Sequence, residues 1–419
     1  MLQVLSGAWA LLLGMSLLMV GNGMQGTLLG IRGEIEGFST LEMSIVMSAY
    51  FAGFLGGSRM APGMIRRVGH VRVFAALASL ISAVMILYPT FTEVWVWTLG
   101  RVLIGFCFSA VYVTAESWLN NAATNENRGQ ALSLYMIVQT AGIVLSQALL
   151  LTADPSGYVL FVIPSVLVSI AVTPILLSIS PTPAFDRTKP MSLKELVGFS
   201  PLGCVGMFLL GGVFSAQFGM ASVYGAKAGL SVAQISTFVA TFFVGAVVLQ
   251  YPIGWISDRM DRRILILILS AIGAGGSLVG MLMGAQFTML LVSAFVVGGM
   301  SNPLYSLLIA HTNDFLEHDD MAAASGGLIF INGLGAISGP IITGYMMDVV
   351  GPGGFYLFTG VLFALLVVYA GYRSTVGRQV LETGAYVAVT PSSTPVALEY
   401  AQEYAIETEL GDENTTNRG

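Results

Sequence analysis

Charge is scarce in this chain. Only 10% of its 419 residues are Asp, Glu, Lys or Arg, and 55% are hydrophobic, whereas a soluble domain carries about 25% charged residues. This composition excludes a soluble globule. The three histidines, His70, His311 and His318, show no metal-ligand spacing, and the sequence has no glycine-rich phosphate loop or nucleophile elbow. We therefore expect no enzyme activity, no cofactor, no metal site and no nucleic-acid partner.

Twelve apolar runs are long enough to cross a membrane. A hydrocarbon core about 30 Å thick needs about 20 apolar residues per helix. The runs cover residues 6–31, 40–58, 73–90, 94–118, 129–151, 157–178, 201–226, 232–257, 264–284, 287–313, 321–347 and 355–372. These runs predict an all-α polytopic membrane protein. Cys107 and Cys204 lie inside such runs, so we expect buried free thiols rather than a disulfide.

Basic residues predict the orientation. If the N-terminus is cytoplasmic, 14 of the 17 Lys and Arg residues fall on the cytoplasmic side. Arg32 and Lys227 then lie outside, and Arg101 lies within a run. The positive-inside rule therefore places both termini in the cytoplasm. We expect a monomer embedded in the lipid bilayer of a plasma membrane, which would be the inner membrane of a bacterium.

The chain repeats itself at an offset of 192 residues without gaps. Residues paired at this offset are Gln25 with Gln217, Gly33 with Gly225, Gly37 with Gly229, Ser39 with Ser231, Ser44 with Ser236, Phe51 with Phe243, Gly53 with Gly245 and Arg67 with Arg259. Two parallel halves related in this way are typical of membrane transporters. The sequence thus predicts two pseudo-symmetric six-helix bundles.

A polar stretch divides the chain. We expect one bundle over residues 1–178, a cytoplasmic linker over 179–200 and a second bundle over 201–373. Within the linker, Ser192-Leu193-Lys194-Glu195 has the capping-box pattern that starts a short amphipathic helix. Residues 374–419 contain a Pro and Ser cluster and an acidic run, which predict a disordered tail. We favour a passive end over a regulatory tail.

Several motifs resemble those of the Major Facilitator Superfamily. Its G-x-x-x-D-R-x-G-R-R signature is similar to the stretch formed by Gly254, Asp258, Arg259, Arg262 and Arg263, in which Asp261 replaces one glycine. The first-half copy departs further, with Pro62 and Arg66 in place of the first Gly and the Asp. The family's R-x-x-x-G element resembles Arg101 to Gly105, and residues 69–72 and 116–120 look most like the YcaD-like group. This resemblance implies a twelve-helix transporter that works by alternating access.

Charged residues at the cytoplasmic helix ends are candidates for a conformational latch. Asp258 and Glu116 oppose the sign of their surroundings, so we expect them to pair with arginines when the cytoplasmic side is shut. The proposed partners are Arg259 and Arg262 for Asp258, and Arg66 or Arg128 for Glu116. The alternative is that these arginines serve only as topology anchors.

A glycine pattern in the eleventh run is similar to the family's antiporter element. It consists of Gly326, Gly335, Gly339, Pro340 and Gly344. The pattern lies in helix 11 rather than helix 5, and Thr343 replaces one glycine. We therefore favour close helix packing around small residues over an antiporter mechanism.

The resemblance implies a central cavity lined by helices 1, 4, 7 and 10. The candidate substrate-binding residues on these helices are Asn22, Gln25, Arg101, Tyr112, Gln217, Tyr224, Asn302 and Tyr305. Packing is the alternative role for Tyr112 and Tyr305. Arg101 is the strongest candidate, because an arginine at a helix centre costs roughly 2.5–3.5 kcal/mol on insertion scales and survives mainly where it has a function.

The positive charge of Arg101 indicates which charge the solute can carry. Since no Asp or Glu lies near the middle of any run, Arg101 is the clearest deep charge. Such a cavity favours a neutral, zwitterionic or anionic solute over a cation. Proton coupling and facilitated diffusion both remain open. The alternative functions are a drug or metabolite:proton antiporter, and a membrane scaffold or sensor that has lost transport.

Overall fold

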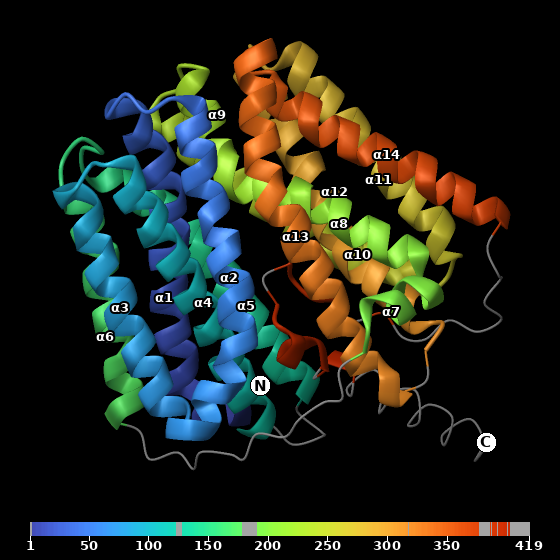
Figure 1. Ribbon diagram of the computed structural model, residues 1–419, viewed down its shortest axis with the longest axis horizontal. Coiled ribbons are helices and arrows are strands. Elements are labelled where there is room, and N and C mark those ends of the chain that lie inside the picture. Colours follow the sequence, from blue (N-terminus) through green and yellow to red (C-terminus); the bar gives the residue numbers. More distant parts are fainter. Residues whose placement is uncertain are drawn as a thin grey trace.

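The structure, a computed structural model, describes most of the chain. The described residues are 2–122, 128–177, 191–316, 318–376, 386, 388–391, 393–399 and 401–402. Within them the regular structure is helical (Figure 1). The first half holds α1 (Leu2–Ile35), α2 (Thr40–Val68), α3 (His70–Thr90), α4 (Val94–Ala122), α5 (Arg128–Leu149), the 3-10 turn η1 (Leu150–Thr152) and α6 (Val159–Leu177). A short helix, α7 (Leu193–Phe199), precedes the second half. The second half holds α8 (Pro201–Ser215), the π-helical segment η2 (Ala216–Met220), α9 (Ala221–Lys227), α10 (Val232–Ser257), α11 (Arg262–Met283), α12 (Phe287–Asn313), α13 (His318–Val350) and α14 (Gly354–Val376).

The helices confirm the predicted membrane architecture. Eleven spans in the described part of the chain are long and apolar enough to cross a bilayer, with α8, η2 and α9 together forming one of them. The twelfth, α2, has 29 residues and is less apolar because it contains several Ser and Gly residues, one Glu and three Arg. Cys107 and Cys204 are buried and free, as predicted.

The repeat is visible in the turns that precede α2 and α10. Gly37 and Gly229 have φ values of 79° and 73°, in the left-handed region that favours glycine. Ser39 and Ser231 then cap the two helices through capping boxes with the residues at N3. Residues 192 positions apart therefore start the equivalent helices in the same way.

The repeat also sets how neighbouring helices cross. A Cβ on Gly53 of α2 would lie 1.9 Å from the Val102 carbonyl oxygen of α4, and one on Gly245 of α10 would lie 2.2 Å from the Phe295 carbonyl oxygen of α12. Only glycine fits at such distances. The α2–α4 pair and the α10–α12 pair thus share one packing geometry.

Close packing accounts for two glycines of the pattern in α13. A Cβ on Gly335 would lie 2.0 Å from the Phe208 carbonyl oxygen, and one on Gly339 would lie 2.1 Å from the Ser215 hydroxyl, both on α8. A Cβ on Gly326 would meet nothing within 4 Å. The packing interpretation therefore holds at Gly335 and Gly339 and does not extend to Gly326.

One end of the molecule is rich in arginine. This arginine-rich end carries Arg66 and Arg67 at the end of α2 and Arg262 and Arg263 at the start of α11. Helix α7 lies at the same end (Figure 1) and starts with the predicted capping box at Ser192. Residues 179–190 of the predicted linker lie outside the described residues.

The opposite end, which we call the Lys227 end, joins the two halves directly. Lys227 Nζ lies 2.7 Å from Glu34 Oε2, and a Cβ on Gly30 of α1 would lie 2.1 Å from the Ser222 hydroxyl of α9. The Ser48 hydroxyl of α2 also donates a hydrogen bond to the Ile337 carbonyl of α13. The bundles are therefore closed against each other at this end.

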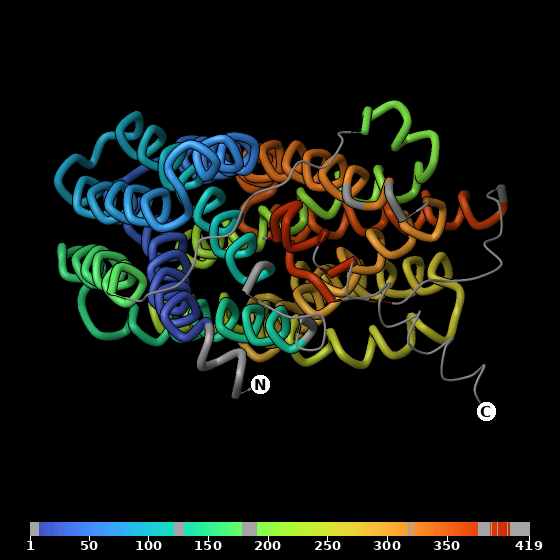
Figure 2. Tube along the Cα trace, turned by 90° about the horizontal axis from the view of Figure 1, so that it is seen from below, coloured from blue at the N-terminus to red at the C-terminus, as the bar shows by residue number. Residues whose placement is uncertain are grey.

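At the arginine-rich end a segment of the C-terminal region lies between the bundles. Figures 1 and 2 show it in red between α5 and α13. Its described residues, which run from 386 to 402 with gaps at 387, 392 and 400, are helical at 395–399 and at 401–402. The predicted disorder from residue 374 is therefore wrong here, because these residues are packed, and α14 extends to Val376. Residues 377–385 and 403–419 lie outside the described part.

Candidate functional site

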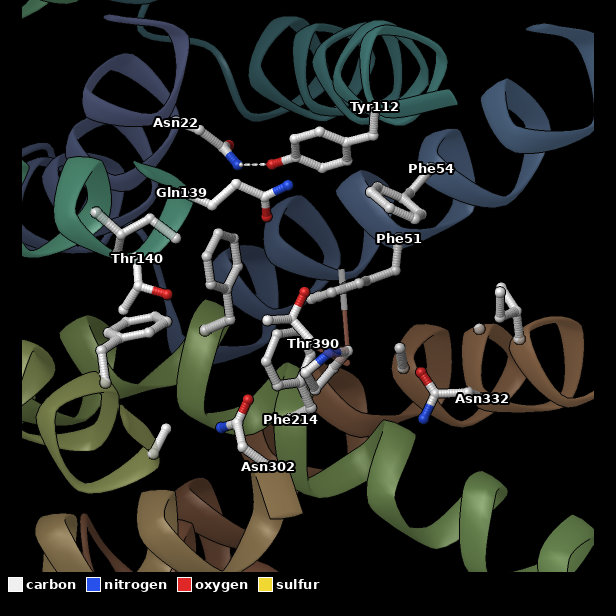
Figure 3. A pocket seen from close by; sticks show the side chains of 18 of the residues that line it. Asn22, Phe51, Phe54, Tyr112, Gln139, Thr140, Phe214, Asn302, Asn332 and Thr390 are labelled. Carbon is white, nitrogen blue, oxygen red and sulfur yellow. Dashed lines mark hydrogen bonds between the residues drawn. The ribbon is translucent and has the colours of Figure 1, made fainter. Parts of the chain in front are cut away.

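A cavity of about 120 Å³ lies between the two halves. Its walls come from α1, α2, α4 and α5 on one side and from α8, η2, α10, α12 and α13 on the other. Thr390 and Pro391 of the C-terminal segment complete it toward the arginine-rich end. Figure 3 shows Thr390 between Phe214, Asn302 and Phe51. Both halves thus contribute to a single site.

Aromatic and amide side chains dominate the lining. The aromatic residues are Tyr50, Phe51, Phe54, Tyr112, Phe214, Phe218 and Phe243. The amide residues are Asn22, Gln139, Gln250, Asn302 and Asn332. Among the described residues that line the cavity, none is charged. Such a surface can stack against the faces of a ring and hydrogen-bond to its edges.

Asn22 is held in place by neighbours on three helices. Its Nδ2 donates to the Tyr112 hydroxyl at 2.9 Å (Figure 3) and lies 3.4 Å from the Tyr50 hydroxyl. Its Oδ1 accepts from Gln25 Nε2 at 3.2 Å. Each of these residues is at least 95% buried. The network fixes the orientation of the Asn22 amide at the cavity wall.

Arg101 lies behind this network. It is fully buried, its Nη1 donates to Gln25 Oε1 at 2.7 Å, and its guanidinium carbon lies 4.6 Å from the centroid of the Tyr50 ring. Its Nε and Nη2 have no hydrogen-bond partner among the described residues. Since Arg101 is not part of the lining, its charge is linked to the cavity through Gln25 and Asn22 and through the ring of Tyr50.

Gln217 occupies the equivalent position in the second half. It lies in η2 and exchanges hydrogen bonds with Ser301 of α12, at 3.1 and 3.2 Å. Its repeat partner Gln25 contacts an arginine on α4, whereas Gln217 contacts a hydroxyl. The two halves therefore share the glutamine but differ in charge. A π-helical segment often marks a functional site, and sequence periodicity gave no sign of this one.

The eight candidate residues fall into three groups. Asn22, Tyr112 and Asn302 line the cavity, and Gln25, Arg101 and Gln217 form a layer behind it. Tyr224 packs instead on Phe355 and Phe238, with ring centroids 5.1 and 5.5 Å away. Tyr305 is buried outside the lining, as the packing alternative predicted.

Three lining amides were missed because the family pattern restricted attention to helices 1, 4, 7 and 10. Gln139, Gln250 and Asn332 belong to α5, α10 and α13. An amide within a long apolar run was the available signal, since a buried amide needs a partner.

The arginines of the predicted latch have other contacts. Arg262 pairs with Asp314, and both are 98% buried within the second half. The Arg259 guanidinium stacks on Trp255, 4.1 Å from the ring centroid, and donates to the Trp255 carbonyl. Asp258 Oδ1 accepts from the backbone N–H of Tyr386 at 3.2 Å. The predicted pairing of Asp258 with these arginines is therefore not the arrangement in this structure.

Glu116 also contacts the C-terminal segment. Its carboxylate accepts hydrogen bonds from the Tyr135 hydroxyl at 3.2 Å, from the Thr394 backbone N–H at 3.3 Å and from the Thr394 hydroxyl. Arg66, one predicted partner, is exposed. The side chain of Arg128, the other, lies outside the described part. Both latch acids thus bind the segment in this structure.

Comparison with known proteins identifies the family. The profile described as Major Facilitator Superfamily matches residues 11–223 and 202–385. The chain is 25% identical over 342 residues to an uncharacterized MFS-type transporter YcaD of Salmonella arizonae, covering 81% of this chain and 88% of the relative. A YcaD of Escherichia coli O6:K15:H31 is 27% identical over 346 residues, covering 81% of this chain and 88% of the relative.

Solved structures share the fold. A mutant of the nucleoside transporter NupG superposes with a TM-score of 0.73 at 14% identity, covering 87% of this chain and 98% of that one. A bacterial homolog of the human lysosomal transporter Spinster, inward-facing and unoccupied, gives 0.66 at 16% identity, covering 97% and 94%. A mutant of the E. coli fucose:proton symporter FucP gives 0.56 at 16% identity, covering 88% and 98%.

Proposed function

Because this chain belongs to the Major Facilitator Superfamily, we propose that it is a secondary transporter that moves a small uncharged organic solute by alternating access. One observation carries the proposal. The cavity lies between two pseudo-symmetric bundles, and its described lining is aromatic and amide without a charged side chain. A charged solute would lose its hydration there without gaining an opposite charge.

The lining also supports a solute that contains a ring. Asn22 and Gln139 lie on one side of the cavity and Asn302 and Asn332 on the other, with aromatic rings between them (Figure 3). Phe218 and Phe243 meet edge to face, with centroids 6.4 Å apart. NupG is a nucleoside transporter and FucP a fucose:proton symporter. Nucleosides and hexoses are therefore suitable probes of this site.

We infer that the arginine-rich end faces the cytoplasm, because the positive-inside rule predicts this orientation. The contacts at the Lys227 end then close the outer side. A solute bound in the cavity would leave toward the cytoplasm. Gly335 and Gly339 of the α13 pattern pack closely on α8, so they do not require an efflux mechanism.

Uptake by the purified protein in liposomes tests the proposal. We expect uridine, adenosine or a hexose to enter, and adenosine monophosphate and organic cations to enter much less. Asn22→Ala and Asn302→Ala should lower the affinity for the transported probe by about tenfold, as expected for a lost hydrogen bond of about 1 kcal/mol or more. Ser79→Ala is the control, since that exposed hydroxyl donates to a carbonyl of its own helix.

Two outcomes would contradict the proposal. A preference for adenosine monophosphate or a cation would overturn the assignment of an uncharged solute. Failure of every probe to enter or to raise the melting temperature would favour a scaffold without transport. Loss of uptake on addition of a proton ionophore would show coupling to a proton gradient. The buried Glu116 is then the candidate proton carrier.

A further inference from the structure

The described residues of the C-terminal segment, which spans 386–402, are packed like part of the core. Val389, Thr394 and Leu398 are at most 2% exposed. Val389 donates its backbone N–H to the Ser306 hydroxyl at 3.0 Å, and that hydroxyl donates to the Val389 carbonyl at 2.9 Å. Burial raises the pKa of Tyr386, so its phenol stays neutral. A tail that only contacted the protein surface would not bury its side chains to this extent.

The contacts of the segment reach both halves. Thr394 donates two hydrogen bonds to Glu116 of α4, in the first half. On the second half, the Tyr386 hydroxyl accepts from Gln250 of α10 at 2.9 Å, and Ser306 of α12 holds Val389. Gln402 donates to the Ser325 hydroxyl of α13. The segment therefore bridges the two bundles at the arginine-rich end.

The same segment reaches the cavity. Thr390 and Pro391 belong to its lining, and Thr390 points in between Phe214 and Asn302 (Figure 3). The segment thus lies between the cavity and the arginine-rich end. For the bundles to close at that end, as alternating access requires, this volume must be vacated.

We propose that the arginine-rich mouth of the cavity is a peptide-binding site whose ligand is residues 386–402 of the same chain. While bound, the segment blocks both solute passage and closure of the bundles, so the full chain transports only in the fraction of time in which the segment is released, and more slowly than a chain without it. The block of transport rests on the proposed function, whereas binding of the segment does not. Ten peptide steps join Val376 to Tyr386 and span at most about 35 Å. This short tether keeps the released segment at a high local concentration.

Glu116 gives the site its specificity for this segment. A buried carboxylate needs hydrogen-bond donors, and the backbone N–H and hydroxyl of Thr394 supply two. Thr394 is therefore the residue whose change should release the segment most selectively.

Cysteine labelling tests the site without any knowledge of the solute. In a background in which Cys107 and Cys204 are replaced by alanine, Thr140→Cys places a thiol on the cavity wall. A charged maleimide should label this thiol about tenfold faster in a chain that ends at residue 378 than in the full chain. A synthetic peptide of residues 386–402 should restore slow labelling to the shortened chain, and a scrambled peptide should not.

Point variants keep the test independent of truncation. Thr394→Val should speed labelling severalfold in the full chain. Thr375→Val is the matched control, because the Thr375 hydroxyl is exposed and donates to the Tyr372 carbonyl of its own helix. Equal labelling of the full chain, the shortened chain and Thr394→Val would overturn the proposal.

Uptake by the same variants separates the two proposals. Faster labelling of the shortened chain without uptake of any probe would support the peptide site and contradict the transport function. If the full and shortened chains take up the probe equally and are labelled equally, the result would support the transport function and contradict the peptide-binding site.

Discussion

Arg101 is buried, but it does not face the cavity as the sequence predicted. The sequence indicated a deep charge, and the residue is fully buried. It does not line the cavity, because Tyr50 and Gln25 lie between. Helical periodicity could place Arg101 on one stripe with Tyr112, but it could not show which side chains stand in front of it.

A buried cation with an amide as its hydrogen-bond partner is costly, so removing its charge should stabilise the protein. We expect Arg101→Gln to raise the melting temperature by a few degrees, which corresponds to about 1–2 kcal/mol, since the desolvation cost disappears. Solute affinity should fall because Gln25, and through it Asn22, loses its anchor. Thermal unfolding and liposome uptake measure the two effects.

Arg72→Gln is the control for that prediction. Arg72 is exposed in the first turn of α3. Its loss should change both quantities little, because exposed charges contribute about 0–1 kcal/mol. A lower melting temperature with unchanged uptake in Arg101→Gln would show that the arginine is structural.

At the scale of helices, the repeat predicted the correct architecture. Equivalent turns and helix crossings in the two halves require the same residue type at the same position. Glycines at 37 and 229 turn the chain and those at 53 and 245 let helices cross closely. The structure confirms that these pairs, found by the offset alone, have equivalent geometry. The π-helical segment η2 could not be predicted from the sequence. Its composition is that of an ordinary apolar helix, and only its hydrogen-bond geometry distinguishes it.

The crossing of α2 and α4 makes a direct prediction. Gly53→Ala would force a Cβ to within 1.9 Å of the Val102 carbonyl oxygen, and overpacking of this kind costs about 1–3 kcal/mol or more. Gly63→Ala on the same helix meets nothing within 4 Å. We expect a clear fall in melting temperature for the first and none for the second. Equal melting temperatures would contradict the packing geometry.

The C-terminal segment could not be predicted for a different reason. Its Pro and Ser residues and the acidic run that follows it are typical of disorder. Its burial depends on a site assembled from Glu116, Gln250 and Ser306 on three helices. Those partners are far apart in the sequence, so the local composition of the segment could not predict these contacts.

At the scale of the whole molecule, the account depends on rearrangement between the two halves. The Lys227 end is closed by direct contact between bundles, while the arginine-rich end is bridged by the segment. Transport requires that the Lys227 end open. A reversible lock across that end therefore tests the central claim.

Met47→Cys with Gly219→Cys provides the lock. A Cβ on Gly219 would lie 3.3 Å from the Cβ of Met47 on the other half, close to the range of about 3.5–4.5 Å found in disulfides. Ser82→Cys with Ser165→Cys is the control, because these hydroxyls lie 2.8 Å apart within the first half.

Liposome uptake of the transported probe should stop when the Met47–Gly219 pair is oxidised and return on reduction, whereas the Ser82–Ser165 pair should transport in both states. Full uptake through the oxidised Met47–Gly219 pair would contradict alternating access through this cavity.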